Sequence, residues 1–377
     1  MNNEVNVVEN EVFEEVLDGY TVIGLGNTGT NIIKAIAHRY DLRDLKLFAI
    51  DSVTSNISLD DVNRITYIPI ISDEKSGSGR VRERGAAMCS YHKDLGDFDK
   101  MWDVISGSKS PVIVISSSAG GTGSGSMPVI CEHIINELDK HVIPIIVIPS
   151  KDDPVAYHLN TSDLLLELDN AGVETYGMFR NVSGERNYDP INEEIVDFIE
   201  IILGKRYHAT TSDSIDESDI DQLLKTPGRV MAVSAKANEI NTLIRKLTKN
   251  MFAGFQPAWT DEEADNITFM SAYSLRSMFA KTDFKRVFDD VRHRVKSVFD
   301  EYSHIEEDDN DGNLEATAII AGLPRPSIND VNTEFNQAES IASGMKKAVR
   351  PSFMSRKSKS TFNVPAAKKS KINWDKH

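Results

Sequence analysis

Short apolar runs alternate with longer stretches of helical spacing along the first half of the chain. Four of the runs are predicted to be strands: Tyr20–Ile23, Lys46–Asp51, Pro111–Ser117, which is rich in β-branched residues and typical of a buried strand, and Val142–Ile148. Helical spacing follows two of them, from about Gly29 to Tyr40 and from Met127 to Lys140. Strands that alternate with helices predict an α/β fold with a mainly parallel, Rossmann-like sheet covered on both faces.

The pattern changes in the second half. A strand-like run, Thr175–Arg180, precedes a strongly apolar helix at Asn192–Gly204, and a Thr-Pro-Gly break follows at 226–228. The elements expected after this break are a strand at Arg229–Ala235, a helix near Asn238–Phe252, a strand near Ile267–Tyr273, a helix near Lys281–Tyr302 and a strand at Glu315–Ala321. The second half is therefore predicted to be an α+β domain that a long helix joins to the first.

Charge is distributed unevenly along the 377 residues, whose net charge is −16. Ten Lys or Arg and a single acid lie between Met345 and His377, a net charge of +9 that leaves −25 for the rest. This basic segment contains few large apolar residues and is expected to be disordered when free. An acidic body with a basic tail suggests that the two parts have different partners.

Cysteine content and apolar run length indicate the compartment. Two cysteines, Cys89 and Cys131, cannot form a disulfide framework, which favours a reducing cytosol. The N-terminus is acidic rather than signal-like, and the longest apolar stretch, around Val142–Pro149, is too short to span a bilayer. We expect a cytoplasmic protein without a membrane partner. The nine histidines show no metal-ligand spacing, so no structural zinc is expected.

A first glycine loop follows the first predicted strand. Residues 24–29 fit G-x-G-x-x-G between a strand and a helix, a pattern in which glycines let the backbone approach a phosphate at a helix N-terminus. The candidate ligands around it are Gly24, Gly26, Asn27, Thr28, Gly29, Asn31 and Asp51. Alone, this loop also fits an NAD-dependent oxidoreductase, or a tight turn that packing requires.

A second glycine loop, Ser116–Ser126, again separates a buried strand from a helix. A simple dinucleotide-binding domain needs one such loop, and no Walker motif G-x-x-x-x-G-K-[ST] is present. Two loops therefore predict a phosphate chain held by backbone amides and hydroxyls without an essential lysine. The candidate ligands in this loop are Ser118, Ala119, Gly120, Gly121, Thr122, Gly123 and Ser124.

Residues Gly120–Gly125 fit G-G-T-G-[SA]-G, and with this motif the chain resembles the tubulin/FtsZ superfamily. Ala49–Ser52 resembles the ribose-side loop of that superfamily, and 149–154 occupies the place of its fifth loop. Residues 77–80 look like its γ-phosphate-sensing loop, with Gly77, Gly79 and Arg80 as candidate ligands. The resemblance implies a GTPase that binds GTP or GDP with Mg²⁺ and polymerises head to tail. Arg80, Arg82 and Arg84 would either neutralise γ-phosphate charge or form surface pairs.

Two asparagines fall where the superfamily recognises guanine. Asn181 follows the strand-like run, and Asn192 opens the apolar helix. An amide has a donor and an acceptor that match the edge of guanine. Without the resemblance, Asn181 would be interpreted as a turn residue and Asn192 as a helix cap.

An acidic segment precedes the Thr-Pro-Gly break. In an acidic protein such a segment is usually a solvated loop, but the resemblance implies that it enters the next subunit's nucleotide pocket and polarises the attacking water. The FtsZ pattern N-x-D-x-x-D is met imperfectly, because its second aspartate falls at Gln222. The expected catalytic pair is Asp216 and Asp219, with Glu217 as a weaker third acid.

Several departures from FtsZ resemble the TubZ branch, namely the acidic N-terminal helix, the Thr-Pro-Gly break, residues 321–326 and the lysine-rich end. TubZ implies a filament that segregates plasmid or phage DNA in a prokaryotic or phage-infected cell, through an adaptor bound to a centromere-like site. The tail, with Ile372 and Trp374, would bind that adaptor, contact DNA directly, or lie on a neighbouring subunit. A filament for cell division or phage positioning, and a nucleotide-binding protein without turnover, are the alternatives.

The patterns divide the chain into six segments. They are an N-terminal amphipathic helix (1–18), a GTP-binding domain (19–190), a central helix (191–212), an acidic catalytic loop with the second domain (213–328), a C-terminal helix (329–345) and the basic tail (346–377).

Overall fold

The computed structural model describes residues 19–39, 42–53, 63–71, 77–150, 153–181, 187–204, 215, 217–253, 269–294, 298–307 and 314–323. The expected N-terminal helix (1–18), C-terminal helix (329–345) and basic tail (346–377) lie outside these residues, and so does Asp216.

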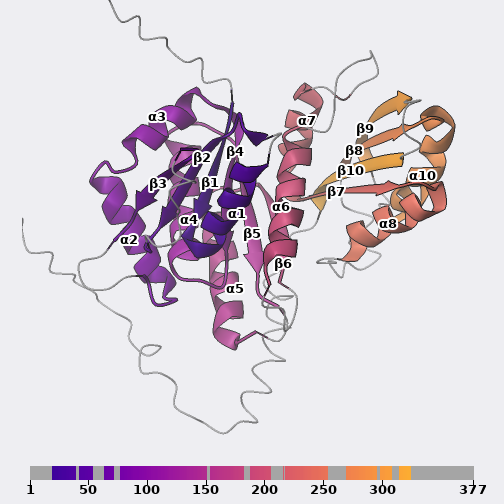
Figure 1. The fold of residues 1–377 in the computed structure, drawn as a ribbon. Helices are drawn as coiled ribbons and strands as arrows, with labels where there is room; N and C mark the ends of the chain where they lie inside the picture. The colour runs from indigo at the N-terminus through magenta and orange to yellow at the C-terminus, as the bar shows by residue number, and fades with distance from the viewer. Residues whose placement is uncertain are drawn as a thin grey trace, which may run out of the picture. The chain divides into compact units, whose positions relative to one another are not determined.

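Strands and helices alternate through the first half, as the sequence pattern predicts (Figure 1). The strands are β1 (Tyr20–Leu25), β2 (Lys46–Asp51), β3 (Ile65–Pro69), β4 (Lys109–Ser117), β5 (Val142–Ile148), β6 (Thr175–Arg180), β7 (Gly228–Ala237), β8 (Phe269–Ser277), β9 (Val298–Glu307) and β10 (Leu314–Leu323). The helices are α1 (Gly26–His38), α2 (Arg82–Asp94), α3 (Asp99–Gly107), α4 (Thr122–Asn136), α5 (Val155–Asn170), α6 (Asp189–Ile202), α7 (Glu217–Leu224), α8 (Ile240–Ala253) and α10 (Ala280–Arg294).

The described strands form one sheet in the order β3-β2-β1-β4-β5-β6-β7-β10-β8-β9. Neighbours from β3 to β7 are parallel, β10 is antiparallel to β7 and β8, and β8 and β9 are parallel. The chain goes from β1 to β2 and β3 on one side, then returns to β4 on the other side of β1. The strand order thus reverses between β1 and β4, and ligands of open parallel sheets bind at such a switch point.

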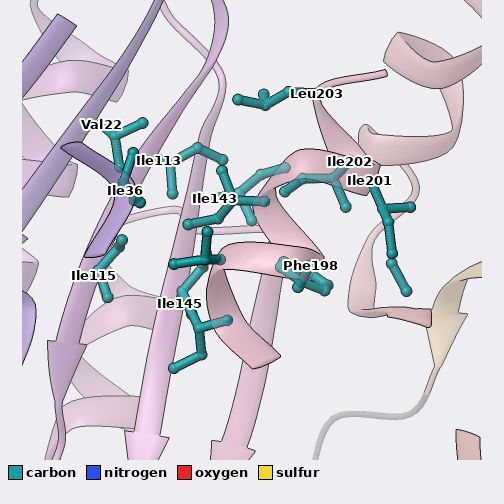
Figure 2. Close-up of a cluster of buried hydrophobic side chains, with 14 of the residues drawn as sticks. Val22, Ile36, Ile113, Ile115, Ile143, Ile145, Phe198, Ile201, Ile202 and Leu203 are labelled. Carbon is teal, nitrogen blue, oxygen red and sulfur yellow. The ribbon is translucent and has the colours of Figure 1, made fainter. Parts of the chain in front are cut away.

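Alternate residues of the parallel strands enter two separate cores, as the two-residue period of a strand requires. Val22 faces a cluster that includes α1 and α6, whereas its neighbour Ile23 faces one formed with α2, α3, α4 and α5. Figure 2 shows Ile202 of α6 beside Ile143 on β5, and Phe198 of the same helix belongs to the same cluster. A third cluster packs α8 and α10 onto β7, β8 and β10. The helix predicted at 192–204 is therefore a buried element that lies against the sheet.

One predicted element is wrong. The helix expected over Lys281–Tyr302 ends at Arg294, and Val298–Glu307 forms strand β9. The residues from Glu301 to His304 alternate between exposed and more buried positions, the period of a strand, and β9 pairs with β8 along its length. Glu and Asp are uncommon in strands, but pairing with a neighbouring strand overrides their weak intrinsic preference for other structures.

Candidate functional site

The two glycine loops meet at the switch point between β1 and β4. Gly26, the first residue of α1, has a φ of +65°, and a Cβ there would lie 3.0 Å from the backbone nitrogen of Gly123. A Cβ on Gly123 would lie 2.5 Å from the carbonyl oxygen of Leu25. The loops therefore pack backbone against backbone. The N-termini of α1 and α4 lie together, so two positive helix ends share one location.

Packing alone explains part of the first loop. A Cβ on Gly24 would come within 2.4 Å of the carbonyl oxygen of Gly29, and one on Gly29 within 2.5 Å of that of Ile115. By contrast, Asn27 and Asn31 are exposed and Thr28 is half-buried. The two glycines allow the tight turn, which leaves the polar side chains of the loop at the surface.

A chain of hydroxyl groups joins three of the predicted loops. The Ser52 and Thr122 hydroxyls are 2.9 Å apart, and the Thr122 hydroxyl donates to Ser78 Oγ at 3.2 Å. Asp51 ends β2 with a buried carboxylate that accepts the Ser52 amide at 2.7 Å. The residues expected at the ribose, at the γ-phosphate and in the second glycine loop are thus neighbours, although they lie far apart in the sequence.

The loop before α2 has an unusual backbone. Gly77, Gly79 and Arg80 all have positive φ, at +82°, +65° and 65°. Arg80 is exposed, and its guanidinium carbon lies 5.1 Å from the ring centre of Tyr157 on α5. A Cβ on Gly79 would meet no atom within 4 Å, so this backbone borders open space.

Arg82 differs from both roles that the sequence suggested. It is 4% exposed, so its guanidinium is buried rather than at the surface, although its partner Glu167 is half exposed. Its guanidinium donates to Glu167 at 2.6 Å and to the carbonyl oxygens of Ser124 and Asn160, both at 3.2 Å. Arg82 holds α2, α4 and α5 together beneath the second loop.

Within the second loop, several candidate ligands already have internal contacts. The Ser118 hydroxyl pairs with that of Thr161 at 2.7 Å, and the Ser124 hydroxyl donates to the carbonyl of Gly120. Gly120 differs, because a Cβ there would meet no atom within 4 Å. The open side of the loop is thus its backbone at Gly120, while its serine hydroxyls support the loop from within.

The two asparagines follow β6. Asn181 donates its backbone N–H to Ile148 at 3.0 Å, while its buried Oδ1 has no hydrogen-bond partner among the described residues. Asn192 does not open α6 as predicted, because the helix begins at Asp189 and Asn192 lies one turn in. The sequence motifs did not point to Tyr188, which occupies the N-cap position of this helix, is 54% exposed and stands one helical turn before Asn192. An aromatic four residues from the predicted base ligand was the available signal.

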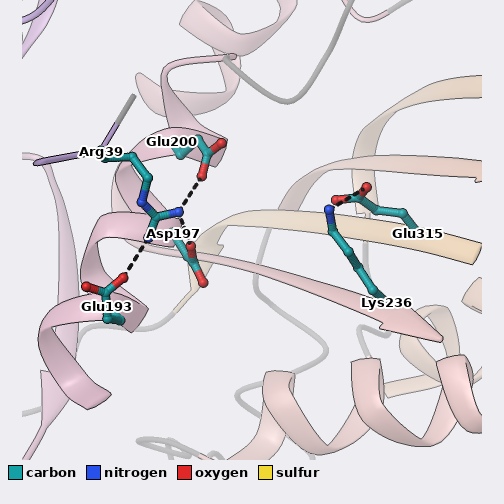
Figure 3. A network of polar contacts seen from close by, with 6 residues as sticks. All are labelled: Arg39, Glu193, Asp197, Glu200, Lys236 and Glu315. Atoms are coloured by element: carbon teal, nitrogen blue, oxygen red, sulfur yellow. Dashed lines mark hydrogen bonds and ion pairs between the residues drawn. The ribbon is translucent and has the colours of Figure 1, made fainter. Parts of the chain in front are cut away.

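Helix α6 is tied to α1 by one cation. Arg39, which follows α1, binds Glu193 at 2.8 Å, Asp197 at 3.1 Å and Glu200 at 3.3 Å, along one side of α6 (Figure 3). The three acids lie at helical spacing, so one guanidinium contacts successive turns. This network fixes the helix that carries Asn192 relative to the helix that follows the first glycine loop.

The acidic helix α7 lies near the amino ends of the parallel strands, opposite the glycine loops. It contacts β4, β8 and β10 within the described residues. His141 immediately precedes β5; burial lowers its pKa to about 4, and the charges of Asp221 and Lys225 on and after α7 act on it. Because the glycine loops follow the carboxyl ends of the strands, the seven residues of β5 separate them from α7 by about 20 Å.

The predicted acids are placed unequally. Asp219 lies on α7 and is half-buried, whereas Glu217 is the first residue of that helix and its side chain lies outside the description, as does Asp216. Asp221 pairs with Lys225 at 2.6 Å. The acidic segment is therefore partly a helix rather than only a loop.

Comparison with known proteins agrees with this geometry. The sequence profile of the family described as "Tubulin like" matches residues 63–323, which is more than half of the chain. The chain belongs to the tubulin-like family. It is 27% identical over 226 residues to the tubulin-like protein CetZ4 of Haloferax volcanii, an alignment that covers 55% of this chain and 57% of CetZ4. The chain thus spans little more than half the length of that relative.

Solved structures share this tubulin-like fold. The GTPγS-form protofilament of TubZ from Bacillus thuringiensis serovar israelensis superimposes with a TM-score of 0.67 at 16% identity, covering 88% of this chain and 95% of TubZ. The GDP-bound monomer of CetZ1 from Haloferax volcanii superimposes with a TM-score of 0.63 at 19% identity, covering 85% of this chain and 99% of CetZ1. The predicted superfamily and fold class are confirmed. Structures of both CetZ and TubZ are similar to this chain, so its assignment to the TubZ branch stays a prediction.

The described part of this tubulin-like chain has no helix long and apolar enough to cross a bilayer.

The contact between the loops gives a prediction for stability. In Gly123→Ala the added methyl would overlap Ser116 Oγ and the Leu25 carbonyl, at 2.3 and 2.5 Å. We expect the free energy of unfolding, measured by urea denaturation, to fall by about 1–3 kcal/mol. Gly120→Ala is the matched control, because its methyl enters open space and leaves that free energy within about 0.5 kcal/mol. Equal stability of the two variants would contradict the packing described.

Proposed function

We propose that this chain binds GTP at the two glycine loops, polymerises head to tail, and hydrolyses GTP where two subunits meet. The observation that supports this most is the position of α7. Helix α7 and the glycine loops lie at opposite ends of the parallel strands of the sheet. The acids are too far away to act on a nucleotide in the same subunit, but translation of a second copy along the strand direction brings its α7 to the loops.

Phosphate binding is supported by the joined helix N-termini and by the open backbone at Gly120 and Gly79. Two positive helix ends favour a polyphosphate, and open glycines let it approach the N–H groups. Mg²⁺ would arrive with the nucleotide. Because Mg²⁺ in nucleotide sites keeps several waters and binds the substrate phosphates, phosphate and water oxygens would supply most of its ligands.

The choice of base is supported by Asn181 and Tyr188. The buried Asn181 Oδ1 is an acceptor in need of a donor. Guanine presents donors at N1 and at its 2-amino group, whereas adenine presents an acceptor at N1. The exposed Tyr188 ring, one turn from Asn192, offers a face on which a base can stack. Asn192 would then approach the same base from α6.

The chemistry proposed for the acids is the positioning of water. Phosphoryl transfer needs little covalent chemistry from the protein, so a carboxylate that orients the attacking water and receives its proton suffices. Asp219 on α7 is our main candidate, together with Asp216 and Glu217. This assignment requires the acid of one subunit and the nucleotide of the next.

The cargo is the least constrained part of the proposal. The +9 tail suggests a partner distinct from the polymerising body. Following the resemblance to TubZ, we propose that this partner of the tail is a DNA-bound adaptor, so that the filament segregates plasmid or phage DNA. Direct DNA contact by the tail and a filament for cell division or phage positioning are the alternatives.

Base selection is tested at Asn181. In Asn181→Ala the guanine donors would lose their acceptor, so the Kd for GTP should rise about tenfold or more. The measurement is equilibrium competition of GTP and ATP against a fluorescent guanine nucleotide. Asn181→Asp keeps an acceptor oxygen and should retain preference for GTP, and Asn170→Ala, an exposed site on α5, should behave as the parent. Equal competition by ATP in the parent chain would exclude the proposed specificity.

Catalysis in trans is tested at Asp219. Asp219→Ala should bind GTP and assemble, yet its turnover per subunit should fall by about a hundredfold. Asp221→Ala on the same helix, whose carboxylate already pairs with Lys225, should stay within about threefold. Phosphate release is measured over a range of protein concentrations. If the parental rate per subunit does not rise with concentration, the reaction does not need a second subunit.

The tail is tested by truncation. Deletion of 346–377 leaves the glycine loops and α7 in place, so GTP-dependent pelleting should persist. Pelleting of labelled DNA in the presence of adaptor should be lost. Trp374→Ala in the full chain should also lose DNA if the tail binds the adaptor, whereas direct phosphate contact would be insensitive to this change and steeply salt-dependent. DNA pelleting by the truncated chain would contradict the role of the tail.

A further inference from the structure

Asn160 on α5 reaches across to the backbone of two different loops. Its Nδ2 amide donates to the carbonyl oxygens of Ala119 at 3.0 Å and Gly120 at 3.4 Å, both in the second glycine loop. The same nitrogen lies 3.5 Å from the carbonyl oxygen of Arg80, in the loop before α2. One side-chain amide thus contacts three carbonyls that border the site, and nothing in the sequence motifs points to it.

These contacts, together with the Ser124 hydroxyl that donates to the Gly120 carbonyl, determine which way the peptide groups face. In a planar trans peptide the N–H of one residue points opposite to the carbonyl of the residue before it. Because the Ala119 carbonyl points to Asn160, the Gly120 N–H points away from Asn160. Because the Gly120 carbonyl also points to Asn160, the Gly121 N–H points away from it as well. Gly120 borders open space, so directing carbonyls into α5 leaves donors for an anion and removes oxygens that would repel it.

Asn160 is itself held firmly. Its backbone carbonyl accepts a hydrogen bond of 3.2 Å from the buried guanidinium of Arg82. The same guanidinium pairs with Glu167, two turns further along α5. The next residue, Thr161, shares a hydroxyl contact with Ser118 at 2.7 Å. The amide therefore occupies a fixed position relative to the loop before any ligand enters.

We infer that Asn160 is a positioning residue that aims the backbone N–H groups of Gly120 and Gly121 at the nucleotide phosphates. It also couples the second glycine loop to the loop at Arg80, because one amide serves carbonyls of both. This inference rests on the proposed binding of GTP at the glycine loops. Asn160 acts through the backbone and does not itself touch the nucleotide.

The test separates phosphate recognition from base recognition. Asn160→Leu keeps the volume of the side chain and removes its donors, and Asn160→Ala removes both. Affinities for GDP and for guanosine are measured by competition, with thermal unfolding as a check on folding. Asn170→Leu, on the exposed end of the same helix, is the matched control.

We expect the GDP Kd of both Asn160 variants to rise about tenfold or more, because misdirected N–H groups lose charge-assisted hydrogen bonds. The guanosine Kd should stay within about twofold, since base contacts come from other elements, and the control should match the parent in both. A purely structural role would weaken GDP and guanosine alike, which would overturn the inference. So would an unchanged GDP Kd. A parent chain that binds no GDP would instead contradict the proposed function itself.

Discussion

The rest of the site depends on a contact between two backbones. Gly26 and Gly123 lie so close that neither position has room for an unhindered side chain, and this brings the starts of α1 and α4 together between β1 and β4. The hydroxyls of Ser52, Thr122 and Ser78 then join the neighbouring loops to this point. A site built from backbone and hydroxyls can bind a phosphate chain without the lysine of a Walker motif. The glycines are therefore required first by packing, and their suitability for phosphate follows from the same lack of side chains.

The parallel strands of the sheet separate two halves of one proposed active site. Parallel strands place all their carboxyl ends at one edge, where the glycine loops lie, and their amino ends at the other, where α7 lies near His141. The α6 helix, held to α1 through Arg39, passes between these regions with its apolar side against the sheet. A subunit with two half-sites at opposite ends is incomplete alone and complete in a head-to-tail chain. Polymerisation and hydrolysis would thus share a single structural cause.

The sequence patterns predicted the bounds of an element correctly where a single run of residues determines that element. The strands Lys46–Asp51, Val142–Ile148 and Thr175–Arg180 have the predicted bounds, because a short, largely apolar run bounded by polar or turn residues fits a buried strand. Strand β9 was missed because its pairing with β8 is a tertiary interaction that overrides local preference. Helix α4 begins at Thr122, five residues before the predicted start, because the last residues of the glycine loop are its first turn.

The candidate site was predictable as a set of motifs but not as a network. The positions of the glycine loops and of Asn181 could be predicted because these segments follow strands in a recognisable order. The contacts of Arg82 and Asn160 could not be predicted, since their partners lie on other elements, 40 to 85 residues away in the sequence. An arginine next to a predicted phosphate loop suggests an anion ligand, and only burial reveals that it supports the loop instead.

A mixing experiment tests the central claim most directly. Asp219→Ala leaves the proposed nucleotide site intact and lacks the acid, whereas Gly120→Leu places a side chain in the open space at that site and retains α7. Each variant alone should hydrolyse GTP slowly. If the acid of one subunit acts on the nucleotide of the next, an equimolar mixture should release phosphate faster than the sum of the two separate variants, because mixed contacts restore complete sites. A mixture no faster than that sum would show that the two half-sites do not act together across subunits.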